Sequence, residues 1–218
     1  MNRLTKHSDH LRSWSELHGS ETGTCAWNSH AIVMEKHGPL ILVDPLPLMD
    51  PAMDQIGRLG KPAMIFLTSA YHVRDAEAFR ARWGCPVCIH ELGATTTEIR
   101  VDRTVGDNVE LIEGVRTVHL PGLYWPEETA LLVPGDPPAL VVGDALCGPR
   151  SDLDLPPGHV GMFSTKHVRD VAVGRRTLDG LCDLDFGLLV FGHGDPVRQY
   201  PREALRLFLD TDPFWQLA

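Results

Sequence analysis

The sequence lacks the features that would place it in a membrane, in a secretory route or in a multidomain array. No apolar stretch approaches the roughly 18 residues that span a bilayer, and the first ten residues, MNRLTKHSDH, lack the apolar segment of a signal peptide. No Pro/Gly/Ser tract or charge run marks a linker between two cores. We therefore expect a cytoplasmic protein without a membrane partner, folded as one domain over residues 1–218, with 1–12 as a loose N-terminal segment.

Positive charge is also scarce. The chain has 20 Lys and Arg against 29 Asp and Glu, a formal net charge of −9. A nucleic-acid backbone would require a basic face, so no nucleic-acid partner is expected. Hydrophobic residues make up 43% of the chain, which is the proportion of a globular protein with a substantial core. A small-molecule substrate is the expected partner, and the oligomeric state is left open.

The five cysteines do not form a disulfide framework, because their number is odd and they are scattered along the chain. Cys85 and Cys88 have CxxC spacing. A redox pair usually lies at a helix N-terminus, whereas this pair follows a predicted helix and opens the strand-like run PVCIHE. Positions i and i+3 of a strand point to opposite faces, which disfavours a shared metal. We expect buried packing residues, and the alternative of a redox protein is remote.

Hydrophobic patterning predicts strands interleaved with helices. The turn Lys36-His37-Gly38 joins two strands in a hairpin, and a proline at position 201 is typical of the first turn of a helix. Ser164 is a candidate helix cap. The predicted strands are 14–18, 26–34, 40–43, 63–68, 86–90, 129–133, 139–142 and 186–191, with strand-like pattern over 98–120, and the predicted helices are 50–60, 74–83, 164–181 and 201–209.

Polar side chains recur where predicted strands end. Asp44, Asp144 and His193 each follow an apolar strand closely, and His72 and Asp75 lie in the loop after another. Taken singly, a strand-end aspartate more often caps a turn, and a lone histidine is more often structural. Strand ends, however, can present several ligands to one edge of a sheet. Imidazole and carboxylate groups bind zinc, manganese or ferrous iron when no thiolate is offered.

Five segments in order carry a family resemblance. They read NSHAIVMEKHGPLILVDP, IFLTSAYHVRDAEAF, VHLPGLYWPEETALLV, ALVVGDAL and LLVFGHGDPV. Together they resemble the metallo-β-lactamase fold superfamily, from about residue 14 to the last helix. The resemblance implies an α/β fold, a four-layer αββα sandwich of two mixed β-sheets flanked by helices. It also implies one or two metal ions at the edge between the sheets, and many members hydrolyse esters, thioesters, lactams or phosphodiesters.

The metal-binding motifs of this family are only partly present. The family motif HxHxDH aligns with AYHVRD at 70–75, which keeps the second histidine as His72 and has Arg74 at the aspartate and Asp75 at the last histidine. The family pattern PGHT reads PGLY at 121–124, without the histidine. Asp144 corresponds to the metal-bridging aspartate and His193 to the last histidine. The resemblance therefore implies His72, Asp144 and His193 as metal ligands.

The number of available ligands limits the metal content. A dinuclear site usually needs about five or six protein ligands, and this edge supplies four at most, which are His72, Asp75, Asp144 and His193. We therefore expect one divalent ion, with zinc first and manganese or iron as alternatives, or none. Arg74 would add a fixed positive charge where a second ion would otherwise lie, neutralising Asp144 or holding a substrate carboxylate. The alternative is an arginine that faces solvent from the start of a helix.

Two functional hypotheses follow. The first is a metal-dependent hydrolase acting on an ester or thioester, in which the ion activates a water molecule, Asp75 is the fourth ligand or the proton acceptor, and Arg74 contributes to catalysis. The loop 152–162 would shape the pocket. The second is a metal-free pseudoenzyme or small-molecule binding protein that keeps the fold, with Asp144, His193, Asp75 and Arg74 in an ion-paired network.

Overall fold

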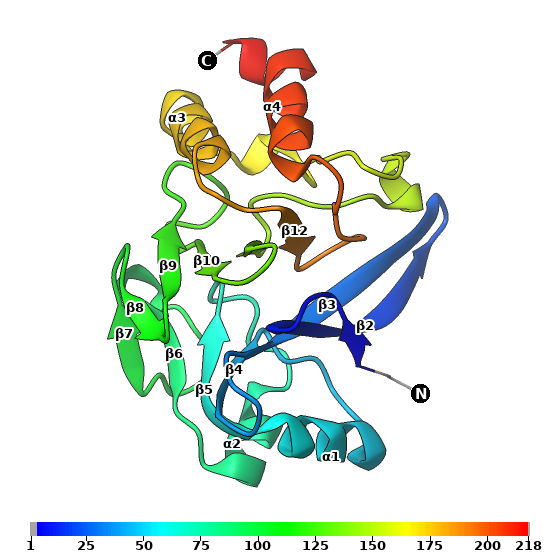
Figure 1. Ribbon diagram of the computed structural model, residues 1–218. Coiled ribbons are helices and arrows are strands. Elements are labelled where there is room, and N and C mark those ends of the chain that lie inside the picture. The colour runs from blue at the N-terminus through cyan, green and yellow to red at the C-terminus, as the bar shows by residue number, and fades with distance from the viewer. Residues whose placement is uncertain (1–3, 218) are drawn as a thin grey trace.

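The computed structural model describes residues 4–217 and contains two mixed β-sheets that pack face to face (Figure 1). The larger sheet has the strand order β1 to β7, and the smaller has the order β12-β11-β10-β9-β8. Strands β4 to β7 run parallel to one another, as do β11 and β12, and the other pairs are antiparallel. The strands of the larger sheet are β1 (Thr5–Lys6), β2 (Leu11–Ser20), β3 (Gly23–Val33), β4 (Pro39–Val43), β5 (Lys61–Leu67), β6 (Val87–His90) and β7 (Arg103–Val105). Those of the smaller are β8 (Glu110–Ile112), β9 (Val115–His119), β10 (Thr129–Val133), β11 (Ala139–Val142) and β12 (Leu188–Phe191).

Helices cover the outer face of each sheet (Figure 1). The first two helices lie against the larger sheet, and the last two lie against the smaller one. Their bounds are α1 (Asp50–Leu59), α2 (Ala76–Trp83), α3 (Val171–Cys182) and α4 (Pro201–Thr211), and the short 3-10 helices are η1 (Glu91–Gly93), η2 (Ser151–Leu153), η3 (Thr165–His167) and η4 (Trp215–Leu217). The predicted αββα sandwich is confirmed. Among the described residues, no helix is both long and apolar enough to cross a membrane.

The alternation of side chains along β4 shows how the layers form. Leu40 and Leu42 belong to the core beneath α1 and α2, whereas Ile41 and Val43 belong to the core between the sheets. All four are fully buried. Because successive side chains of a strand point to opposite faces, a continuous apolar run is what a strand covered on both sides requires. The sequence run PLILV satisfies that requirement.

The cysteines follow the same rule. Cys85 packs in the core beneath the helices, and Cys88 packs between the sheets, so the two thiols lie on opposite sides of the larger sheet. All five cysteines are free and buried. The prediction that the CxxC pair serves packing is confirmed. Burial also raises the pKa of Cys88 to about 11, which leaves the thiol protonated at neutral pH.

Two predicted helix starts were wrong. The helix expected over 164–181 is two elements, η3 and α3, because Asp170 caps the longer helix: its Oδ1 accepts from the Val173 amide at 2.9 Å. Ser164 caps only η3, by accepting from the Lys166 amide. The helix expected from residue 74 begins at Ala76. Between 98 and 120 the regular strands are β7, β8 and β9, and residues 98–102 are not strand.

The N-terminal segment 1–12 was expected to be loose. Residues 1–3 of it lie outside the described part of the chain. Beyond them, β1 pairs with β2 in the register Thr5 with Ser13, and Leu11 is fully buried. The predicted hairpin turn at 36–38 is confirmed, since β3 and β4 are antiparallel neighbours on either side of it.

Candidate metal centre

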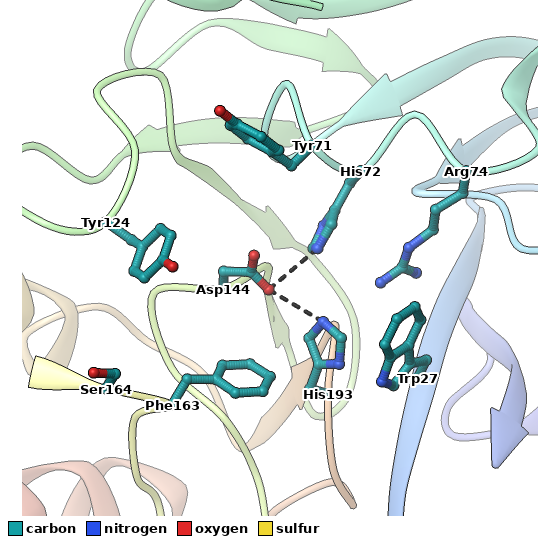
Figure 2. A pocket seen from close by; sticks show the side chains of 9 residues that line it. All are labelled: Trp27, Tyr71, His72, Arg74, Tyr124, Asp144, Phe163, Ser164 and His193. Carbon is teal, nitrogen blue, oxygen red and sulfur yellow. Dashed lines mark ion pairs between the residues drawn. The ribbon is translucent and has the colours of Figure 1, made fainter. Parts of the chain in front are cut away.

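Three side chains from different strand ends meet at one edge of the sandwich (Figure 2). Their ligand atoms, from His72, Asp144 and His193, all lie within 4.8 Å of one another. Asp144 Oδ1 is 3.1 Å from His72 Nε2 and 3.2 Å from His193 Nε2. The structure thus brings together the three residues that the sequence predicted as metal ligands.

Strand register explains why Asp144 and His193 are neighbours. β11 and β12 are parallel, and their last paired residues are Val142 and Phe191. Asp144 and His193 each follow two residues later, so both emerge at the same edge of the smaller sheet. His72 reaches this edge from the loop after β5, in the other sheet.

The close approach of the loops depends on Gly143. A Cβ atom at this position would lie 2.4 Å from Thr68 Oγ1 and 2.8 Å from Thr68 Cβ. Any side chain would therefore push the β11 end away from the β5 end. Thr68 is itself fully buried and opens the loop that carries His72.

His72 is oriented by a carboxylate that the sequence did not identify as a site residue. Its Nδ1 is 2.8 Å from Asp44 Oδ2, and Asp44 is only 2% exposed. Asp44 also accepts from the Thr68 amide (2.8 Å) and from Thr68 Oγ1 (2.5 Å). Since the carboxylate can only accept, this network assigns the proton of neutral His72 to Nδ1 and leaves the Nε2 lone pair facing Asp144. Histidines that bind metals in proteins are usually held in this way.

The charged groups around the site shift one another's pKa values. Burial alone would lower the pKa of His72, but the nearby carboxylates of Asp144 and Asp44 raise it to about 10. Burial opposes ionisation of Asp144, yet the imidazole of His72 beside it holds its pKa well below the usual value. Burial lowers the pKa of His193. Burial and the Asp144 charge raise the pKa of Glu128 well above its usual value.

The contacts of Asp144 fit a metal site better than a hydrogen-bonded one. Its Oδ1 is buried, and it has no partner of hydrogen-bond geometry among the residues that the structure describes. Buried polar atoms are rarely left in this state. Ligand atoms that each lie about 2.0–2.2 Å from a tetrahedral ion are roughly 3.3 Å apart, close to the 3.1 and 3.2 Å separations from the two histidine nitrogens. Two imidazoles and one carboxylate are a donor set that suits zinc, manganese or iron.

Arg74 turns into the site instead of facing solvent. It precedes α2 in a left-handed conformation (φ 47°), and its side chain lines the cavity. Its Nη1 donates to the carbonyl oxygens of Asn28 and Asp44, the latter at 3.0 Å, and to Ser29 Oγ at 3.4 Å. Its Nη2 is buried and has no hydrogen-bond partner among the side chains that the structure describes. The sequence alternative of a solvent-facing arginine was wrong.

Asp75 lies apart from this group. It occupies the cap position of α2, and its amide donates to the Pro45 carbonyl at 2.9 Å. Burial and the neighbouring Glu16 raise the pKa of its carboxyl. Asp75 is not among the residues that line the cavity beside the metal ligands. Its expected role as a fourth ligand or a proton acceptor stays a prediction.

A cavity of about 370 Å³ opens beside the three ligands (Figure 2). No residue of the loop 152–162, which was expected to shape the pocket, is among the described residues that line it, whereas Phe163 and Ser164, directly after that loop, do line it. Its aromatic side chains come from separate loops and from β3, so no periodic pattern in the sequence marks them. The lining residues are Trp27, Tyr71, His72, Arg74, Tyr124, Asp144, Phe163, Ser164 and His193.

Two further polar residues near the edge have structural partners. Glu127 Oε1 accepts from the Ala70 amide at 2.9 Å, and Glu128 Oε1 accepts from the Ala145 amide at 2.5 Å. Both glutamates are buried. Neither belongs to the group of ligand atoms found among the described residues. Their visible role is to tie the ligand-bearing loops to the β9–β10 connection.

Comparisons with known proteins agree with this architecture. Among solved structures, the chain resembles a metallo-β-lactamase from Pontibacter korlensis, with a TM-score of 0.72 and 14% identity over 97% of this chain and 100% of that one. It also resembles the metallo-β-lactamase IND-7, with a TM-score of 0.71 and 14% identity over 95% and 97% of the two chains. A flavoprotein from Thermotoga maritima gives a TM-score of 0.67 and 16% identity, over 96% of this chain and 61% of that one.

These identities are low, so the structural likeness establishes the fold alone. No curated protein matches the sequence significantly. A sequence profile described as the metallo-beta-lactamase superfamily matches residues 3–171, which is well over half of the chain. The chain therefore belongs to the metallo-β-lactamase superfamily.

Proposed function

We propose that the protein is a metal-dependent hydrolase that holds one divalent ion on His72, Asp144 and His193. The observation that carries this proposal is the convergence of three ligand atoms within 4.8 Å, with the buried Asp144 Oδ1 lacking a partner of hydrogen-bond geometry among the described residues. The ligand types suit zinc first, and manganese or iron as alternatives. An ester or thioester is the proposed substrate.

Arg74 supports a single ion. Its guanidinium is fixed by oxygen atoms of Asn28, Ser29 and Asp44, and it contributes a permanent positive charge to the cavity wall. A second dication would have to bind close to that charge and with few remaining ligands, since the first family histidine is replaced by Ala70. Electrostatic repulsion and a short ligand list therefore both favour one ion.

The bound ion would lower the pKa of a coordinated water toward about 7 and polarise the acyl carbonyl. Water would add to the acyl carbon while the bond to the leaving oxygen or sulfur breaks, giving a carboxylic acid and an alcohol or thiol. The protein's part is positioning. Asp44 holds the His72 ring with its Nε2 toward the site. Arg74 offers the unpaired Nη2 as a positive charge near the developing oxyanion.

A second candidate function is supported by one observation. The pKa of His72 is raised to about 10 by two carboxylates, so a protonated His72 would satisfy both Asp44 and Asp144 without any ion. The same residues would then form a metal-free binding pocket.

The metal content of the purified protein distinguishes the hydrolase from the metal-free binding pocket. Elemental analysis of protein purified without added metal should find close to one zinc, manganese or iron ion per chain, and Asp144→Ala and His193→Ala should each lose it. His159→Ala is the matched control, since His159 is exposed and lies outside the cavity. Absence of metal from the wild type, even after incubation with zinc or manganese, would contradict the hydrolase proposal and favour the metal-free pocket.

A further inference from the structure

Aromatic rings line the cavity, and neighbouring side chains pack against them. On one side, the ring of Tyr71 stacks on Trp125 with 3.8 Å between centroids and 22° between planes. Trp125 in turn meets Tyr124 edge-on, at 4.4 Å and 71°. Tyr71 is nevertheless 66% exposed. One face of this ring is therefore supported while much of its surface stays open.

Trp27 forms a second wall, on β3. Its indole stacks on His18 from the adjacent strand, at 3.8 Å and 22°. It also meets the His193 ring edge-on, at 5.3 Å and 82°. Trp27 is 37% exposed. A large apolar ring is thus held beside a proposed metal ligand without being buried.

Phe163 forms the third wall. Its ring meets His193 edge-on at 4.7 Å and 82°, and the Arg150 guanidinium lies 4.3 Å from its centroid. Arg150 is fixed by a bidentate contact with Asp152, at 2.7 and 2.5 Å. Phe163 is 36% exposed. A cation held over one face of this ring restricts its motion.

These three rings are restricted by their neighbours but remain exposed, which favours binding of a flat apolar ligand. Large apolar side chains left open to water in one concave place mark a binding site. Because neighbouring side chains already restrict these rings, little side-chain entropy is lost when a ligand contacts them. Aromatic pairs gain further from offset-stacked or edge-on geometry, which a saturated ring or a flexible chain cannot supply.

The volume of the cavity and the charges that line it further limit which ligands fit. A volume of about 370 Å³ lies near the lower end of the roughly 300–1,000 Å³ range of small-molecule sites. Among the described residues that line the cavity, Arg74 is the only Lys or Arg, and its Nη1 already donates hydrogen bonds to the protein. A polyphosphate or nucleic-acid strand would require several cations. The cavity therefore suits a compact ligand with at most one negative charge.

We infer that the site takes esters or thioesters whose acyl group carries a single aromatic ring, and that Tyr71 and Phe163 determine this preference. This inference rests on the proposed hydrolase function. The ring would lie among Trp27, Tyr71 and Phe163, with the acyl carbonyl directed at the three metal ligands.

The test uses three thioesters with the same thiol and different acyl groups: phenylacetyl, cyclohexylacetyl and hexanoyl. With zinc-loaded protein, kcat/KM for phenylacetyl should exceed that for cyclohexylacetyl by about tenfold, the ratio expected of one to two aromatic contacts. Tyr71→Ala and Phe163→Ala should each reduce that ratio severalfold. Tyr71→Phe should keep it, because the ring remains, and Leu207→Ala on α4 controls for loss of an exposed apolar side chain elsewhere.

A binding measurement separates failure of the inference from failure of the proposed function. Calorimetry of Asp144→Asn, which removes a ligand charge but no ring, should show tighter binding of phenylacetamide than of cyclohexylacetamide. Turnover of all three thioesters at similar kcat/KM would overturn the inference and leave the hydrolase. Preferential binding of the aromatic amide without turnover of any thioester would overturn the hydrolase and keep the aromatic site. Equal binding of the two amides would overturn the aromatic site.

Discussion

Asp44→Asn tests whether the proposed metal centre depends on the carboxylate behind His72. The amide keeps one oxygen for the Thr68 amide, but it places an NH₂ group where Asp44 Oδ2 accepts from Thr68 Oγ1 and faces His72 Nδ1 at 2.8 Å. To avoid opposing donors, the neutral form of His72 that would bind a metal must carry its proton on Nε2 instead of Nδ1. The nitrogen that faces Asp144 would then carry a proton instead of a lone pair.

The expected magnitude follows from the contacts that are lost. A hydrogen bond to a charged group contributes about 1.5–3 kcal/mol, and the bond between Asp44 and His72 is buried at both ends. We expect the free energy of unfolding, measured in urea with a chelator present, to fall by about that amount. Loss of an orienting partner usually lowers metal affinity by about 10–100-fold, so competition with a chromophoric chelator should show zinc affinity reduced within that range.

Asp102→Asn is the matched control. Asp102 accepts from the Val87 amide at 2.9 Å and pairs with Arg80 and Arg100, away from the cavity. Its replacement should lower stability without changing zinc affinity. Zinc affinity of Asp44→Asn equal to that of the wild type would refute the reasoning, because the ligand would then need no orienting carboxylate.

Two further predictions concern stability. Gly143→Ala places a Cβ atom 2.4 Å from Thr68 Oγ1. We expect the free energy of unfolding, measured in urea, to fall by about 1–3 kcal/mol, the usual cost of overpacking. An unchanged urea midpoint would show that the loop moves to accommodate the methyl group without cost. Burial lowers the pKa of His30 from 6.5 to about 3, so below pH 6.5 the unfolded chain takes up a proton that the folded chain does not. The contribution of neutral His30 to stability is therefore fully present above pH 6.5 and is lost as the pH falls. Between pH 6 and 4, the free energy of unfolding of the wild type should fall by about 1.4 kcal/mol per pH unit more than that of His30→Gln. Parallel pH profiles of the two proteins would show that His30 does not titrate in this way.

The sequence was most informative where neighbouring strands are regular. The bounds predicted for β10 and β11 agree with the structure, and the apolar run ending near Gly192 correctly marks β12. For Asp144 and His193 the short distance from strand end to ligand leaves little freedom in where the side chains emerge. A parallel pair with a fixed register then brings them together. That step needs only local pattern and the rule that parallel strands share an edge.

Asp44 shows where local pattern was insufficient. Its position at the end of β4 was visible, but a strand-end aspartate is common in turns. Its partner, His72, is 28 residues away, and their contact depends on β4 and β5 being parallel neighbours with ends at the same level. For Arg74 the sequence left two orientations open, into the site or toward solvent, because its left-handed conformation departs from the helical pattern of the residues that follow.

The metal-bound and metal-free hypotheses concern the same atom, His72 Nε2. A proton there is stabilised because Asp144 lies in front of the ring and Asp44 behind it, which is why the pKa of His72 is about 10. A divalent ion at the same place would exchange that proton for a doubly charged partner of Asp144, and it would gain His193, whose pKa is lowered by burial so that its nitrogen is already neutral. Ligand deprotonation makes metal affinity depend on pH. The arrangement that makes His72 a strong base therefore also makes it a strong ligand once the proton leaves. For this reason its raised pKa does not by itself count against a metal centre.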